Sequence, residues 1–311
     1  MYKIKENPSD FIVKEQSDIV LKPKGEFTYF LMQKKDYTTM KALDIISGKL
    51  GVPLKHMGFA GTKDRVAITS QMVGVKGISR EKIEGLELDD ISLEVKGFGD
   101  DPISLGDLEG NWFTITVRNI TKKPKKVERI INYFGEQRFS KNNSAIGKAL
   151  VKRDFKKAVS LVLESNGDYE RKMKDFLDMH ETDYIGALRC IPRKIVMMFV
   201  HAYQSSLWNE MAAKSKSDSL PLIGFGTEEN DAIVKVMKKE GITTRDFIFK
   251  EFPELSAEGN DRDVYVDVKD LVINELLDDE LNNGKKKCVV SFFLSKGSYA
   301  TEVIKILFKN C

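Results

Sequence analysis

The periodicity of the apolar residues changes twice along the chain, and this restricts the fold more than any other feature. In the first 120 residues apolar and polar positions mostly alternate, which is typical of strands. The strand-like runs are 10–15, 28–32, 67–75, 91–95 and 113–117. From 127 to about 179, and again from 193 to 213, the spacing becomes helical, and a strand pattern returns at 288–294. This order indicates one sheet that is interrupted by an inserted helical domain.

Helix signals also occur inside the strand-rich parts. Thr38 or Thr39 can cap a helix that Gly51 and Pro53 end. The apolar residues between these signals follow helical spacing: Ala42, Leu43, Ile46 and Leu50. A last helix is expected to begin near Ser298, directly after the final strand.

The net charge of the chain is small but unevenly distributed. The 50 basic and 47 acidic side chains give a formal charge of +3, which excludes a polycationic protein of the histone kind. Residues 1–157 hold 29 basic and 21 acidic side chains, whereas residues 158–311 hold 21 and 26. Lysine runs such as 122–126 are often only solvated surface. Several such runs beside an acidic second part are also consistent with a polyanionic partner.

Cysteine and histidine are too scattered for a metal site or a disulfide framework. They are Cys190, Cys288, Cys311, His56, His180 and His201. No apolar run is long enough to span a membrane, and the first residues lack the apolar segment of a signal peptide. We therefore expect a cytoplasmic protein without a metal, whose chemistry uses carboxylates, lysines, hydroxyls or backbone groups.

The segment 58–71, GFAGTKDRVAITSQ, places one carboxylate in a glycine-supported turn between two strand-like runs. Asp64 lies between Lys63 and Arg65, and such cations favour the ionised form that a carboxylate nucleophile requires. The same cations could hold an RNA phosphate. The alternative is structural, because an aspartate in a turn often only accepts hydrogen bonds from the backbone. A phosphate-binding loop is excluded, since its Gly-x4-Gly-Lys-Ser/Thr pattern is absent.

Two further segments combine polar and aromatic residues. The segment 132–140, NYFGEQRFS, carries the aromatic faces and amides that a uracil pocket needs for stacking and for hydrogen bonds. A packed turn with an incidental arginine is the alternative. The segment 297–301, GSYAT, follows the last strand, and Ser298 within it is also a good helix cap.

These segments occur in the order and with the character of the TruD family of tRNA pseudouridine synthases, which the sequence resembles. The four pieces that carry the resemblance are 7–15, 58–71, 132–139 and 297–301. The most specific strings are Ala-Gly-Thr-Lys-Asp-Arg and Asn-Tyr-Phe-Gly-Glu-Gln-Arg-Phe. The middle of the chain, from Ile191 to Glu210, is similar to archaeal members.

The resemblance implies an isomerase, an intramolecular transferase that converts a uridine of tRNA, usually uridine 13, to pseudouridine. In such enzymes the bond between C1′ and N1 breaks, the uracil turns, and C5 joins C1′. One aspartate is essential, and the matching residue is Asp64. It either attacks C1′ or removes the 2′ proton, and both routes need an ionised carboxylate. The resemblance implies no cofactor and names tRNA as the partner, and it leaves protein partners open.

The same matching implies contacts to the flipped uracil. Phe11 and Tyr299 would border it, and Asn132 would bond to it with support from Phe134. Many bacterial members have Phe in place of Tyr299, and glycine commonly occurs where this chain has Ser140. Tyr299 keeps the aromatic face that stacking requires.

The fold that the resemblance implies is α+β, with a mixed, largely antiparallel sheet flanked by helices. We place this catalytic domain at residues 1–155 and 260–311, and the inserted, mainly helical TRUD domain at 156–259. Residues 1–157 and 258–311, which match the catalytic domain to within two residues, hold 37 basic and 31 acidic side chains. Residues 158–257, which match the insertion, hold 13 basic and 16 acidic side chains. We therefore expect a basic cleft on the catalytic domain. Its basic residues would be Lys5, Lys63, Arg65 and Arg138. Of these, Lys5 and Lys63 resemble residues that contact a phosphate or a sugar.

Three other functions are alternatives to pseudouridine formation in tRNA at uridine 13. A non-catalytic RNA-binding module of the same fold would not need Asp64, yet Asp64 is present together with both pocket segments. A nucleotide-hydrolysing enzyme needs a phosphate-binding loop and paired metal-binding carboxylates, which the sequence does not show. A synthase that modifies another tRNA site or another RNA stays open, because relatives differ in their targets.

Overall fold

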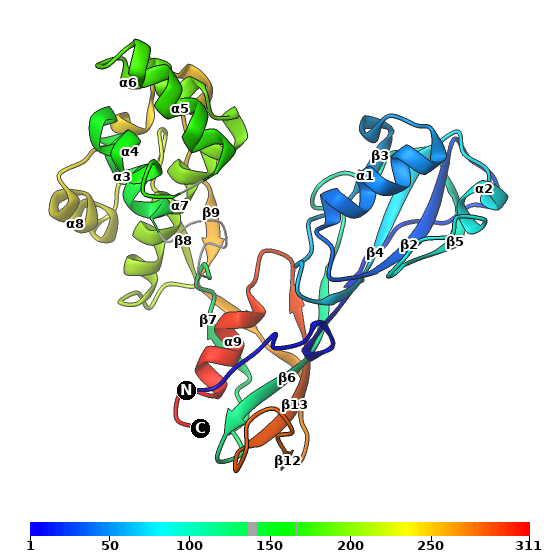
Figure 1. Cartoon of the computed structure of the whole chain (residues 1–311). Helices are drawn as coiled ribbons and strands as arrows, with labels where there is room; N and C mark the ends of the chain where they lie inside the picture. The colour runs from blue at the N-terminus through cyan, green and yellow to red at the C-terminus, as the bar shows by residue number, and fades with distance from the viewer. Residues whose placement is uncertain (136–141, 166) are drawn as a thin grey trace. The chain divides into compact units, whose positions relative to one another are not determined.

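The structure is a computed structural model that describes residues 1–135, 142–165 and 167–311. The chain divides into two compact units (Figure 1). Unit 1 consists of Met1–Ile130 and Val266–Cys311, and unit 2 consists of Ile131–Tyr265. One unit thus contains both ends of the chain, and the other is inserted, as the change of periodicity indicates.

Within the described residues, unit 1 is built on a mixed sheet of nine strands. They are β1 (Phe11–Gln16), β2 (Phe27–Lys35), β3 (Met57–Phe59), β4 (Ile68–Lys76), β5 (Ile91–Gly99), β6 (Gly110–Ile120), β11 (Lys269–Ile273), β12 (Leu277–Asp278) and β13 (Lys286–Ser295). The helices of this unit are α1 (Thr39–Leu50), α2 (Arg80–Glu84) and α9 (Ala300–Leu307), with 3-10 turns η1 (Pro8–Asp10) and η2 (Leu54–His56). The strand order is β11-β13-β6-β1-β4-β2-β5, with β12 beside β13 and β3 beside β4. Only β1 and β4 run parallel among the described pairs of this sheet, which confirms a mixed, largely antiparallel sheet.

The ends of α1 follow from its sequence, whereas the start of α9 does not. The hydroxyl of Thr38 accepts a hydrogen bond of 3.2 Å from an amide of the first turn, and Gly51 ends α1 with φ 68°. Helix α9 begins at Ala300 with Tyr299 as its N-cap residue, and no side chain caps it. Ser298 is therefore not the cap that the sequence suggests, because the N-cap position of α9 lies one residue later, at Tyr299.

One face of the sheet in unit 1 is buried, and register partners on five strands form a row across it. The row comprises Lys34, Thr69, Val13, Phe113 and Phe292, in this order. Each of these residues is at most 9% exposed. Helix α1 packs over β2, β4 and β5, and α9 packs over β6 and β13 (Figure 1). The apolar residues under α1 and those under α9 form two separate clusters. The two members of the row on β2 and β4, Lys34 and Thr69, are polar.

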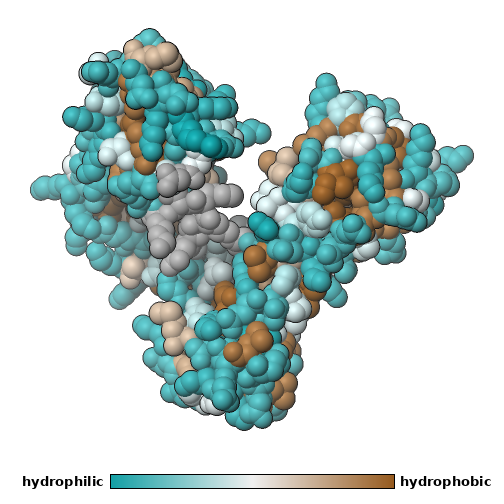
Figure 2. Space-filling model, viewed as in Figure 1, coloured by the Kyte–Doolittle hydropathy of each residue, from teal (hydrophilic) through white to brown (hydrophobic). Residues whose placement is uncertain are grey.

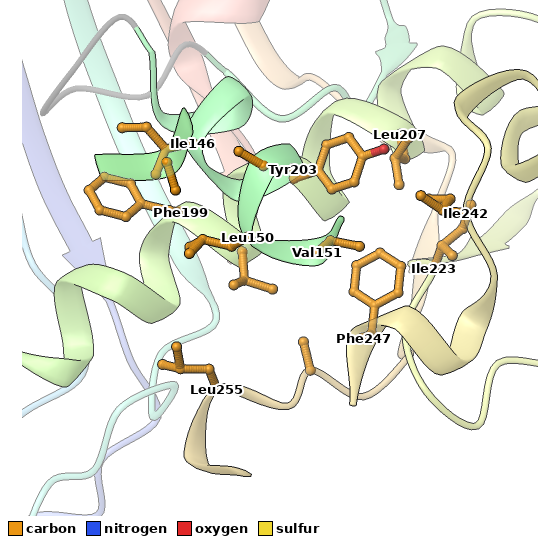
Figure 3. Packing of buried hydrophobic residues seen from close by; sticks show 14 of the residues in the cluster. Ile146, Leu150, Val151, Phe199, Tyr203, Leu207, Ile223, Ile242, Phe247 and Leu255 are labelled. Atoms are coloured by element: carbon orange, nitrogen blue, oxygen red, sulfur yellow. The ribbon is translucent and has the colours of Figure 1, made fainter. Parts of the chain in front are cut away.

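Unit 2 is mainly helical. Its elements are α3 (Asn143–Val151), α4 (Phe155–Val162), α5 (Asp168–Met179), α6 (Tyr184–Arg189), α7 (Arg193–Ala212), β8 (Ser219–Pro221), α8 (Asp231–Glu240), η3 (Thr244–Phe247), η4 (Pro253–Leu255) and β9 (Asp261–Asp263). Strands β8 and β9 pair, and β7 (Arg129–Ile131) pairs with β10 (Tyr265–Asp267) where the chain passes between the units. Side chains of α3 and α7 share one core with residues from the 223–255 part of the chain (Figure 3). Trp208 of α7 is completely buried in this core.

The limits of unit 2 differ from the expected 156–259. Helices α3 and α4 belong to unit 2 because their apolar residues, Ile146 and Val159 among them, pack in its core. Residues 127–135 form β7 and irregular chain rather than helix, because part of this segment pairs with the returning chain: the amide of Asn132 donates to the carbonyl oxygen of Val264 at 2.7 Å.

The surface is mostly hydrophilic on the view of each unit that Figure 2 shows. In the described part of the chain, no helix combines the length and the apolar character that crossing a membrane requires.

Candidate active site

Buried polar side chains hold the backbone of the loop between β3 and β4, which carries Asp64. The hydroxyl of Thr39 accepts a hydrogen bond from the amide of Lys63 at 2.8 Å and donates to Oε1 of Gln71 at 2.9 Å. The side-chain amide of Gln71 donates in turn to the carbonyl oxygen of Gly61 at 2.9 Å. Thr39 and Gln71 are at most 1% exposed. Such bonds fix the loop, because a buried polar group without its partner is destabilising.

A buried lysine holds the peptide group that follows Asp64. Lys34 is the last inward-facing residue of β2, and its side chain is completely buried. Its ammonium donates to the carbonyl oxygen of Asp64 at 2.8 Å and to that of Tyr37. Burial, and next the positive charge of Lys63, lower the pKa of Lys34 to about 8.

Lys63 pairs with Glu15 beneath the loop. The side chains are 7% and 0% exposed, and the Glu15 carboxylate also accepts a hydrogen bond of 3.2 Å from the amide of Met72. This buried pair ties the loop to both β1 and β4. The ammonium of Lys63 is thereby committed to a protein carboxylate.

The carboxylate of Asp64 has a cationic partner from the start of the chain. The Asp64 Oδ2 lies 3.2 Å from Nζ of Lys5, and the two side chains are 12% and 21% exposed. The same ammonium lies 4.1 Å from the ring centroid of Phe11, a buried residue of β1. Lys5 has φ 60°, a left-handed conformation that costs a residue other than glycine roughly 1–2 kcal/mol. Strain of this kind persists where the surrounding contacts enforce it.

Arg65 lies at the solvent side of the loop. Its guanidinium is 3.5 Å from Asp36, and both side chains are at least half exposed. Among the described residues, Asp64 thus pairs with Lys5, which is distant in the sequence, while its neighbours Lys63 and Arg65 pair with other carboxylates. Among the described residues, no group of three His, Cys, Asp or Glu side chains could hold a metal ion.

Tyr299 belongs to unit 1 and is half-buried. It follows the turn at Gly297, where φ is 80°, and precedes the first turn of α9. Its carbonyl oxygen accepts a hydrogen bond of 3.1 Å from the amide of Glu302.

In unit 2, Asn132 and Phe134 are both held by one arginine. The guanidinium of Arg262 donates to the side-chain oxygen of Asn132 at 2.8 Å and to its carbonyl oxygen at 2.9 Å. It also lies 4.0 Å from the ring centroid of Phe134. Phe134 packs edge-on against Trp208, and its backbone exchanges two hydrogen bonds of 2.9 Å with the side chain of Asn209. Arg138 lies outside the described residues.

A family model described as tRNA pseudouridine synthase D (TruD) matches residues 2–168, 162–223 and 212–307. The chain belongs to this family. A tRNA pseudouridine synthase D from Aquifex aeolicus is 38% identical over 67% of this chain, and the match covers 64% of the length of the Aquifex protein. A Methanosarcina mazei relative with the same family name is 29% identical over 97% of this chain and 92% of its own. A crystal structure of a Methanosarcina mazei protein of this family name superposes with a TM-score of 0.76, at 28% identity, over 99% of this chain and 93% of that one.

In this TruD chain, unit 1 brings together four of the residues that the sequence singles out. They are Lys5, Phe11, Lys63 and Asp64. Asn132 and Phe134 lie in unit 2.

Sequence reasoning missed the residues that hold the Asp64 loop and the segment around Asn132. They are Glu15, Lys34, Thr39 and Gln71 in unit 1 and Arg262 in unit 2. Lys34 had a usable signal, because the alternation of β2 directs it to the same side as Phe30 and Met32. Arg262 had none, since it lies far from its partners along the chain.

Proposed function

We propose that this protein isomerises a uridine of tRNA to pseudouridine and that Asp64 is the essential residue. The observation that carries the proposal is the setting of the Asp64 carboxylate, which lies 3.2 Å from a cation and remains 12% exposed on a loop that buried bonds fix. A nucleophile or a base for the sugar needs these conditions: a charge-assisted partner, access to substrate and a fixed position. Membership of the TruD family supports the choice of reaction.

The reaction needs only bond exchange at one nucleotide. The C1′–N1 bond breaks and its electron pair leaves with the uracil, which turns so that C5 can bond to C1′. C5 then loses its proton, and N1 gains one. Asp64 serves this sequence either by forming an ester with C1′, which C5 displaces, or by removing the 2′ proton and returning it.

The contacts to the uracil that we propose are those that membership of the family implies. Phe11 and Tyr299 would border the uracil, and Asn132 would hydrogen-bond to it beside Phe134. The basic residues that we propose for the sugar and the phosphates are Lys5, Arg65 and Arg138, whereas Lys63, which the sequence also suggests, is buried against Glu15. A phosphate near Lys5 would add a second anion to a cation that already holds Asp64, so this lysine links substrate binding to the position of the carboxylate.

Mapping of pseudouridine in purified tRNA tests the role of Asp64. We expect Asp64→Asn and Asp64→Ala to form no product while they bind tRNA within about threefold of the unchanged protein, since the carboxylate is proposed for chemistry rather than affinity. The matched control is Asp44→Asn, which removes an exposed carboxylate of α1 and should leave the rate unchanged. Product formation by the Asp64 variants at the rate of the control would exclude the proposed role.

The proposed target is uridine 13, and a transcript with cytidine at that position tests it. We expect no pseudouridine in this transcript and one in the unchanged transcript. Product at another position in both transcripts would show that the enzyme is a synthase with a different target.

A further inference from the structure

Lys34 stands where the pattern of its strand favours an apolar residue. Phe30 and Met32, the preceding inward-facing residues of β2, are completely buried, and so is Lys34. Among the described residues, its ammonium forms no ion pair with a carboxylate, and its bonds are to two carbonyl oxygens. A buried charge that only dipoles compensate destabilises a fold relative to an apolar side chain of similar size.

The charged groups around Lys34 do not compensate it. Lys63 lowers the pKa of Lys34 in addition to burial, and the charge of Asp36 opposes this only in part. Packing therefore gives no reason for a lysine at this position. Polar groups that break a local rule without a gain in stability are typical of functional sites.

The effect of Lys34 is local to Asp64. Its ammonium holds the carbonyl oxygen of Asp64, while Thr39 holds the amide of the preceding residue, Lys63. The backbone is thus fixed on both sides of the Asp64 side chain. Only the side-chain torsions of Asp64 then remain, and Lys5 restrains those at the carboxylate.

We propose that Lys34 is a positioning residue, which directs the Asp64 carboxylate toward the sugar by holding the Asp64 carbonyl. This inference rests on the proposed function. Lys34 acts through Asp64 and touches no substrate atom. Its removal should therefore slow the chemical step and leave tRNA affinity unchanged.

The test compares Lys34→Met with Lys35→Met, which removes the adjacent, exposed lysine that pairs with Asp90. We measure the single-turnover rate at saturating tRNA, the Kd for tRNA and the Tm of each protein. For Lys34→Met we expect a rate about 100-fold lower, a Kd within twofold of the unchanged protein and a Tm that does not fall. Lys34→Gln, which keeps an uncharged amide as donor, should have an intermediate rate, and Lys35→Met should match the unchanged protein.

A rate for Lys34→Met within threefold of the control would overturn the proposal. So would a loss of rate that accompanies an equal loss of folded protein in both Lys34 variants, because that result assigns Lys34 to folding. If the unchanged protein and Lys35→Met form no pseudouridine, the proposed function itself fails, and this inference fails with it.

Discussion

Arg118 is a buried cation that joins three segments of unit 1 distant in the sequence. It lies on β6, is 4% exposed, and donates two hydrogen bonds of 2.8 and 2.9 Å to Asp10 and one of 2.9 Å to Asp279. Asp10 directly precedes Phe11, and Asp279 lies between β12 and β13. The substitution Arg118→Met keeps much of the side-chain volume but leaves two buried carboxylates without their cation.

The expected loss of stability can be bounded from the structure. Removing one partner of a buried ion pair costs about 3–5 kcal/mol. Burial alone would raise the pKa of Asp279, but hydrogen bonds from the amides of Asn119 and Leu281, from Asn282 and from Arg118 lower it from 3.8 to about 2. This shift corresponds to about 2 kcal/mol of stability from all these donors together. We therefore expect a loss of about 3–4 kcal/mol, shared between the two carboxylates.

The pH dependence gives this prediction a second test. The pKa of Asp279 is depressed in the folded state, so its stabilisation is fully present above pH 3.8 and is lost as the pH falls toward 2. The difference in stability between the unchanged protein and Arg118→Met should accordingly be constant near neutral pH and shrink below pH 3.8. A difference that widens on acidification would contradict the assignment.

The two tryptophans allow unit 1 to be followed by itself. Trp112 lies in unit 1 and Trp208 in unit 2, so urea unfolding in a Trp208→Phe background reports on unit 1 through Trp112 fluorescence. The control is Arg129→Met, which breaks an exposed pair with Asp267 and should cost less than about 1 kcal/mol. A loss below about 1 kcal/mol for the buried arginine as well would refute the reasoning.

Three further predictions concern close packing and the segment around Asn132. A methyl group on Gly147 would lie 1.9 Å from the carbonyl oxygen of Phe199, so Gly147→Ala should destabilise unit 2 by about 3 kcal/mol in urea unfolding. Gly48→Ala, in a helix with open space around the new methyl, should instead stabilise unit 1 by about 1 kcal/mol. Arg262→Met leaves two acceptor atoms of Asn132 without this donor, so Trp208 fluorescence should report a loss of about 2 kcal/mol in unit 2, and equal stability would contradict this account.

Local signals predicted much of the fold because they depend on neighbouring residues. Helix α1 is an example, since its cap at Thr38 and its end at Gly51 are both written in a short stretch of sequence. The position of β1 between β6 and β4, parallel to β4, could not be predicted. It depends on pairings between segments more than 50 residues apart, which no local pattern encodes.

In the candidate site, too, the sequence predicted what depends on neighbouring residues and not what depends on distant ones. Asp64 stands out in the sequence because a turn with glycines and cations surrounds it, and the resemblance gave it a role. The identity of its cation could not be read in this way, because Lys5 becomes its neighbour only when the start of the chain pairs with β6 through Lys3 and Arg118. Sequence neighbours of a turn residue point in different directions, and Lys63 and Arg65 accordingly pair with Glu15 and Asp36.

The buried polar groups under the loop explain how Asp64 is fixed where the loop offers few apolar side chains. Apolar packing is non-directional and would allow the loop to slide, whereas hydrogen bonds of 2.8–2.9 Å to backbone atoms define both position and orientation. Such a network destabilises the fold wherever a partner is missing. The apolar clusters under α1 and α9 lie on either side of it and can supply the compensating stability. It follows that substitutions in these clusters should change mainly the stability of the fold, whereas substitutions in the network should also change the rate of the reaction.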